Sequence, residues 1–100
     1  MWEIKYLEIV EKWLDALTIP QYKSVAKELK LLEMCGNKLK LPHSKTLGGG
    51  LFELRERKFG YRIYYKFEKD YVTLLLHAGD KTSQQKDIKK AKKLLKEIHL

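Results

Sequence analysis

Cationic side chains are concentrated in residues 51–67, which read LFELRERKFGYRIYYKF. The cations are Arg55, Arg57, Lys58, Arg62 and Lys66. An arginine side chain presents a planar fork of N–H donors, and this fork matches the oxygen atoms of a phosphate group. Tyrosines are interleaved with the cations, and aromatic rings can stack on nucleotide bases. The segment therefore predicts binding of a phosphate-bearing ligand, and RNA is favoured.

Extended segments must position these residues. The pattern of aromatic and β-branched residues predicts strands over 51–58, 61–67 and 71–77, with a turn at Phe59–Gly60. The third strand is apolar on both faces, which indicates a central place in the sheet. Side chains alternate along a strand, so every second residue of the cationic segment is expected to share one face.

The register of the first two strands decides which cations meet. A two-residue turn at Phe59–Gly60 predicts that Arg57 lies opposite Arg62. The same register gives the pairs Arg55 with Tyr64 and Glu53 with Lys66. Like charges directly opposite each other destabilise a sheet, and an anion bound between the arginines would offset that cost. The alternative is a solvated sheet face whose cations are partly neutralised by Glu53 and Glu56.

Helical periodicity precedes the sheet. Residues 2–6 predict a short first strand, and apolar residues at helical spacing follow over 7–17. Thr18 and Gln21 resemble a capping box that begins a second helix, and Gly36 is a typical helix end. Because the connection between the helices is short, we expect an antiparallel helical hairpin.

The remaining segments are a loop and a last helix. Residues 39–50 are expected to form a loop, which contains Gly48–Gly49–Gly50. Thr82 and Gln85 form a second possible capping box, followed by an apolar stripe at helical spacing. The sequence therefore predicts one α+β domain over residues 1–100, with an N-terminal helical hairpin and a C-terminal helix packed on a small antiparallel sheet.

Composition restricts the class of partner. The 100 residues carry 21 lysines and arginines against 13 acidic residues, a formal net charge of +8, which favours a polyanionic partner. No apolar run reaches the roughly 20 residues that span a bilayer, and the first residues do not resemble a signal peptide. The single cysteine, Cys35, fits a cytoplasmic location, and the scattered histidines show no metal-ligand spacing.

Three segments together resemble one family. SKTLGGGLFELR (44–55), GYRIYYKF (60–67) and LLLHAGDKTSQQKDIKKAKKLL (74–95) are similar to the RelE/HigB superfamily of toxins, in its phage-derived HigB-like branch. The resemblance implies a microbial-ribonuclease fold with helices on one side of an antiparallel sheet. It also implies ribosome-dependent mRNA cleavage without a cofactor or metal, and a helix-turn-helix antitoxin as partner.

Cleavage through the ribose 2′-hydroxyl needs a base, an acid and cations that stabilise the charged phosphorane. The resemblance places Arg62 as the phosphate clamp, Arg55 as a substrate contact and Lys81 near the family's basic catalytic residue. His77 is a candidate proton carrier, with a buried structural histidine as the alternative. The candidate RNA contacts are Lys45, Arg57, Tyr64, Lys66 and Lys86. His43 is more simply read as a surface residue, and Asp87 stands where some relatives carry a catalytic tyrosine.

Two other functions stay open at the level of sequence. One is the gyrase-poisoning activity of another branch of the same superfamily, which predicts DNA damage without RNA cleavage. The other is a non-catalytic module that binds RNA or ribosomes. Both would use the same positive charge, so the cationic segment alone does not separate them.

Overall fold

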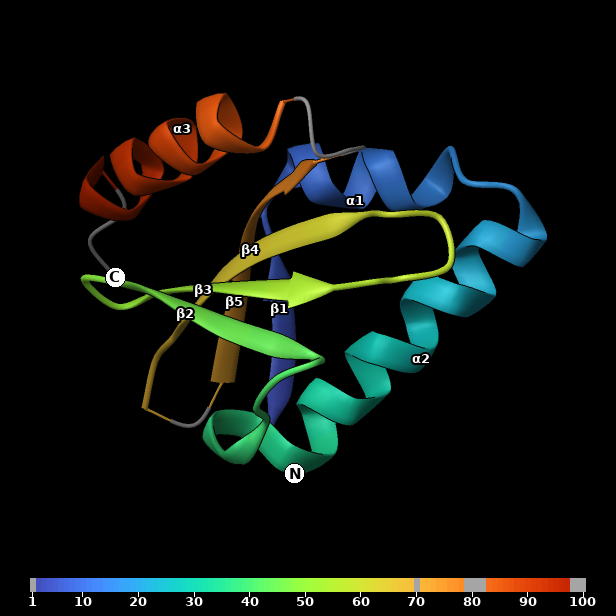
Figure 1. Cartoon of the computed structure of the whole chain (residues 1–100), viewed down its shortest axis with the longest axis horizontal. Coiled ribbons are helices and arrows are strands. Elements are labelled where there is room, and N and C mark those ends of the chain that lie inside the picture. Colours follow the sequence, from blue (N-terminus) through green and yellow to red (C-terminus); the bar gives the residue numbers. More distant parts are fainter. Residues whose placement is uncertain (1, 70, 79–82, 98–100) are drawn as a thin grey trace.

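The protein is described by a computed structural model that covers residues 2–69, 71–78 and 83–97 (Figure 1). In chain order, the elements are β1 (Glu3–Tyr6), α1 (Glu8–Asp15), α2 (Ile19–Cys35), a 3-10 turn η1 (Gly36–Lys38), β2 (Ser44–Gly48), β3 (Leu51–Arg55), β4 (Arg62–Phe67), β5 (Tyr71–Ala78) and α3 (Gln84–Glu97). This order confirms the predicted α+β class.

The strands form one mixed sheet in the order β1-β5-β4-β3-β2. β1 runs parallel to β5, and the other neighbours are antiparallel. The prediction of a loop throughout residues 39–50 is wrong, because Ser44–Gly48 pairs with β3. This strand is short and mostly polar, so its sequence lacks the alternating apolar pattern by which strands are recognised.

Helices cover both faces of the sheet (Figure 1). Val10 of α1 and Val25 of α2 share one buried cluster with Leu54 and Ile63 of the sheet. Side chains of opposite parity point to the other face, where Leu51 and Tyr64 pack with Ala91 of α3, beside several half-buried leucines. The expectation of helices on one side is therefore corrected. β3 and β4 present apolar side chains to both faces, so helices must shield each face of the sheet from water.

The helix boundaries follow local signals. Thr18 begins α2 with a reciprocal cap: its N–H donates to Gln21 Oε1 at 2.9 Å, and its hydroxyl accepts from the Gln21 N–H at 3.4 Å. The short connection to α1 is confirmed, although Figure 1 shows the two helices diverging from it instead of lying side by side. Gly36 ends α2 as expected. The Thr82 of the second predicted cap lies outside the described residues.

Gly36 is expected to resist substitution because two constraints coincide there. Its φ is +53°, and a Cβ atom would stand 1.9 Å from the indole Nε1 of Trp2. Gly36→Ala should lower the free energy of unfolding by about 2–3 kcal/mol. Gly49→Ala is the matched control, since φ is +65° there but no atom lies within 4 Å of the added Cβ. Its cost should be about 1 kcal/mol. Denaturant unfolding measures both, and equal losses would contradict the role of the Trp2 contact.

Candidate nucleic-acid interface

Two arginines face each other across the β3–β4 ladder. The observed partners are Arg55 and Arg62, with Glu53 opposite Tyr64. The predicted pairing of Arg57 with Arg62 is wrong, because residues 56–61 form a longer connection than the expected two-residue turn. The register differs from the prediction by two residues, so the same side chains still share a face. An arginine pair therefore exists, with Arg55 in the place expected for Arg57.

The connection is organised around the carboxylate of Glu56, which is buried. Backbone N–H groups of Lys58, Phe59 and Tyr61 donate to it at 2.8, 3.0 and 3.4 Å, and the Ser24 hydroxyl of α2 donates at 2.5 Å. Burial acts to raise the pKa of Glu56, but the hydrogen bonds from Ser24 and the backbone outweigh it and lower this pKa below its usual value. The carboxylate thus holds the loop closed while it carries a negative charge.

A second buried carboxylate lies beside the arginine pair. Glu53 Oε1 is 2.9 Å from Arg55 Nε and 3.7 Å from Arg62 Nε, and Glu53 Oε2 accepts from Gln84 Nε2 at 2.8 Å. Glu53 is fully buried, so its charge requires such partners. The protein's own anion therefore offsets part of the repulsion between the arginines, and it also connects them to the first turn of α3.

The arginines line one cavity, of about 310 Å³, with lining residues Pro42, Arg55, Glu56, Arg57, Gly60 and Arg62. The Arg62 side chain is only 11% exposed, and its Nε makes no hydrogen bond within the described part of the chain. The three guanidinium groups outnumber the two buried carboxylates of Glu53 and Glu56, so the net charge around the cavity is positive. A phosphate group in the cavity would accept hydrogen bonds from the guanidinium groups that line it.

The other predicted contacts are dispersed. Lys45 is exposed on β2, opposite the backbone of Glu53, and Lys86 is exposed in the first turn of α3. Lys66 lies toward the far end of β4, where its ammonium is 2.6 Å from Glu68. Lys45 therefore lies on the strand next to β3, which carries Arg55, and Lys66 lies on β4 but is paired with Glu68.

Tyr64 is completely buried beneath α3, so its ring is not placed to stack on a base. Burial, and then the negative charges of Glu53 and Asp87, raise the pKa of Tyr64 well above its usual value. The hydroxyl lies near the Glu53 carboxylate without a hydrogen bond of ordinary geometry. The structure therefore assigns the Tyr64 ring to the α3-side core.

Tyr64→Phe should accordingly change little. Because the ring makes the packing contacts and the hydroxyl lacks a well-formed partner, we expect the free energy of unfolding to stay within about 1 kcal/mol of wild type. RNA affinity should stay within about twofold. Thermal unfolding and RNA titration measure these values, and a large loss of affinity in the folded variant would restore Tyr64 as a ligand contact.

The histidines contribute differently from one another. His43 Nδ1 lies 3.0 Å from Glu28 Oε2, so this loop histidine is engaged with α2. The backbone of His77 pairs with Ile63 in the sheet, but its side chain lies outside the described part of the structure. Lys81 also lies outside the described residues. The catalytic roles of His77 and Lys81 therefore stay predictions.

Sequence reasoning gave Glu53 and Glu56 only the role of partly neutralising the cations, and it gave Ser24 and Gln84 none. Glu53 and Arg55 have the same parity on one strand, a signal that they share a face. Glu56 precedes a glycine-containing turn, where a carboxylate can accept from nearby backbone N–H groups. Ser24 and Gln84 come from distant segments, so only the tertiary fold brings them to the site.

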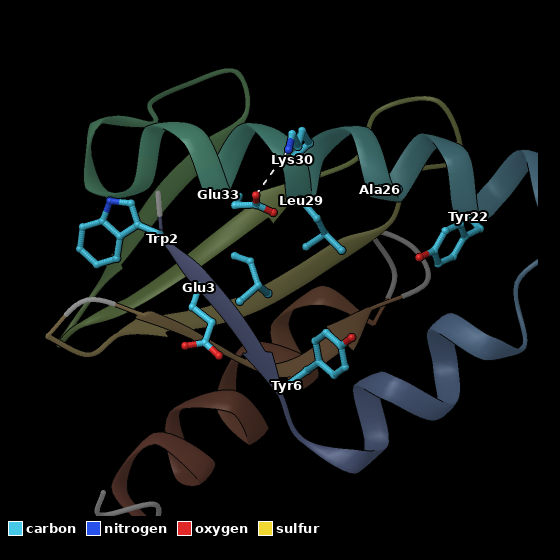
Figure 2. A pocket seen from close by; sticks show the side chains of 9 residues that line it. Trp2, Glu3, Tyr6, Tyr22, Ala26, Leu29, Lys30 and Glu33 are labelled. Carbon is cyan, nitrogen blue, oxygen red and sulfur yellow. Dashed lines mark hydrogen bonds and ion pairs between the residues drawn. The ribbon is translucent and has the colours of Figure 1, made fainter.

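A larger hollow, of about 560 Å³, lies between β1 and α2 (Figure 2). Figure 2 shows Tyr6 and Tyr22 beside it, and Lys30 directed to Glu33 at 3.4 Å. With Glu3 also present, this hollow has no surplus of cations.

Within the described residues, no helix is long and apolar enough to cross a bilayer, and no cluster of three metal-ligating side chains occurs.

The fold is that of the RelE toxins. The isolated Escherichia coli RelE toxin superposes with a TM-score of 0.68 at 16% identity, over 90% of this chain and 98% of that one. RelE in the intact E. coli RelBE complex gives 0.61 at 17% identity, over 81% and 98%. An archaeal RelE–RelB complex from Pyrococcus horikoshii gives 0.55 at 20% identity, over 78% and 93%.

Comparison of the sequence assigns the chain to a narrower group of proteins than the fold does. Residues 12–96 match the family of phage-derived Gp49-like proteins, and the chain belongs to this family. An uncharacterized protein of Haemophilus influenzae is 46% identical over 57 residues, which are 56% of this chain and 58% of the relative. The match thus spans a little over half of that relative's length. The resemblance to the RelE/HigB superfamily is confirmed in family and fold.

Proposed function

We propose that this protein is the toxin of a toxin–antitoxin module and cuts messenger RNA on the ribosome. The observation that carries the proposal is the nearly buried Arg62, which lines a cavity together with Arg55 and Arg57. Such a site suits a phosphodiester better than an isolated carboxylate, because several guanidinium groups converge on it.

In the proposed reaction, the ribose 2′-oxygen attacks the adjacent phosphorus, and the 5′-oxygen leaves with a proton. The products are a 2′,3′-cyclic phosphate and a 5′-hydroxyl end. Arg62 and Arg55 stabilise the negative charge of the phosphorane. His77 and Lys81 are the proposed proton carriers, and the reaction requires no metal or cofactor. Positioning of the message by the ribosome supplies the in-line geometry.

An antitoxin is the proposed partner in the cell. Two of the similar RelE structures are complexes with RelB. The helix-turn-helix type of the antitoxin is what the resemblance to the RelE/HigB superfamily implies. We propose a cognate antitoxin of this kind, with the ribosome and mRNA as the targets, in the cytoplasm. Coexpression of the neighbouring gene product should relieve any growth arrest.

The decisive experiment is to map message ends in bacteria that express the wild type or Arg62→Ala. New 5′-hydroxyl ends that require Arg62 support the proposal. DNA damage without new RNA ends would instead indicate the gyrase-poisoning activity. Ribosome association with intact messages would indicate a non-catalytic binding module. Protein levels measured by immunoblot must match between the two strains.

A further inference from the structure

Three lysines line a hollow on α2 that the proposed cleavage chemistry does not use. The hollow has a volume of about 470 Å³, and its lining residues are Ile19, Pro20, Lys23, Ser24, Lys27 and Lys58. We call it the lysine hollow. Its lining contains three ammonium groups and no carboxylate, and all three lysine side chains are exposed.

These lysines differ from Lys12 of α1 and Lys30 of α2, which have acidic partners. Lys12 pairs with Glu8 at 3.0 Å and Lys30 with Glu33 at 3.4 Å. Within the described ranges, no ion pair joins a carboxylate to Lys23, Lys27 or Lys58. Lys23 and Lys27 are four residues apart on α2, a spacing at which like charges destabilise a helix. A bound anion would offset that repulsion, so the charge of the hollow favours a polyanionic ligand.

The lysine hollow adjoins the arginine cavity through the loop over residues 56–61. Ser24 lines the hollow and donates to Glu56, which lines the cavity. Lys58 reaches the hollow from the same loop that carries Arg57 and Gly60 to the cavity. Figure 1 shows this loop beside the first half of α2. The two sites therefore lie on either side of one short loop.

The same loop carries an aromatic residue. Phe59 follows Lys58 in the loop, is 36% exposed, and stacks on Tyr61 with ring centroids 5.8 Å apart. Alternation of cations with an exposed aromatic ring is the arrangement by which proteins hold single-stranded nucleic acid. An acidic peptide would use the lysines but gain less from the ring, so the observations favour RNA.

We propose that a single RNA strand held in the arginine cavity continues over Phe59 into the lysine hollow, where Lys23, Lys27 and Lys58 bind its phosphates. This path rests on the proposed function and extends it, because it names how the substrate leaves the reacting centre. A strand long enough to reach the hollow should bind more tightly and with a steeper salt dependence than a strand that fills only the cavity.

The test uses two RNAs with methylated 2′-oxygens, which cannot be cut, of about three and about ten nucleotides. The variant replaces Lys23, Lys27 and Lys58 by alanine. We expect it to bind the longer RNA at least about tenfold more weakly, with the shorter RNA unaffected. The slope of log affinity against log salt for the longer RNA should fall by about 2, as expected for three lost phosphate contacts.

The matched control replaces Lys12, Lys38 and Lys40 by alanine, since these exposed lysines are not in the hollow. Both variants lower the formal charge from +8 to +5. Equal losses in both, or no loss in the hollow variant, would overturn the path. Arginines at the three hollow positions should restore the slope, which excludes misfolding. If wild type binds neither RNA, the path is overturned, while the proposed function is still decided by the message ends that require Arg62. If Arg62→Ala abolishes binding of the shorter RNA, the arginine cavity stands independently of the lysine hollow.

Discussion

Arg62→Ala should reduce message cleavage by at least about 100-fold, the usual cost of removing one preorganised donor to a charged transition state. The guanidinium of Arg62 is nearly buried and lines the cavity that we assign to the scissile phosphate. Its loss removes charge where the phosphorane forms, and water that enters the space is a poorer stabiliser. Single-turnover cleavage of a programmed ribosome complex measures the effect on the chemical step.

Folding must be checked in the same variant. The Arg62 side chain is only 11% exposed and its Nε lies 3.7 Å from Glu53, so the substitution also removes a contact inside the protein. Glu53 keeps Arg55 and Gln84, so we expect a stability loss of about 1–3 kcal/mol and a folded protein.

Two further variants separate charge from geometry. Arg62→Lys keeps the charge without the planar fork and should recover only part of the rate. Arg57→Ala, at an exposed position, should cost about tenfold. If the folded Arg62→Ala variant cleaves messages at the full rate, Arg62 is not the phosphate clamp.

Glu56→Ala should produce the largest loss of stability, about 3–5 kcal/mol. The substitution leaves three backbone N–H groups and the Ser24 hydroxyl without their acceptor in a partly buried place. The loop over residues 56–61 should then lose its fixed shape, and with it the position of Arg57. Denaturant unfolding reports the stability, and hydrogen exchange of the loop amides reports the local opening.

Acid should reduce the contribution that the Glu56 carboxylate makes to the stability of the fold. The pKa of Glu56 is lower in the folded protein than its ordinary value of 4.5. The carboxylate therefore stabilises the fold fully above about pH 5, and this stabilisation is lost as the pH falls through the lower, folded value. The stability difference between wild type and Glu56→Ala should shrink over that acid range. Ser24→Ala removes one donor and should cost about 1 kcal/mol. A difference independent of pH would contradict the proposed role of the charge.

The parts of the fold that local signals determine could be predicted. Apolar stripes at helical spacing marked the helices, and the Thr18 cap formed as expected. Strand parity placed the arginines on one face even though the assumed turn was too short, because a shift by two residues preserves the face. The cation-rich segment was correctly identified as the place where arginines converge.

The remaining features depend on contacts between distant residues. The length of the β3–β4 connection follows from Glu56 and its bond to Ser24, which lies 32 residues away in the chain. The burial of Glu53 and Tyr64 follows from the position of α3, which the apolar stripe of the helix does not specify. The β2 strand exists through its pairing with β3, since its own residues have little strand pattern.

The parallel pairing of β1 with β5 has a consequence for synthesis of the protein. Glu3–Tyr6 leaves the ribosome well before its partner Tyr71–Leu74, so β1 cannot pair until β5 has been synthesised. The helices have local contacts and can form earlier. A nascent chain that lacks β5 thus keeps β1 unpaired and the sheet open, and the sheet is completed only once β5 has emerged.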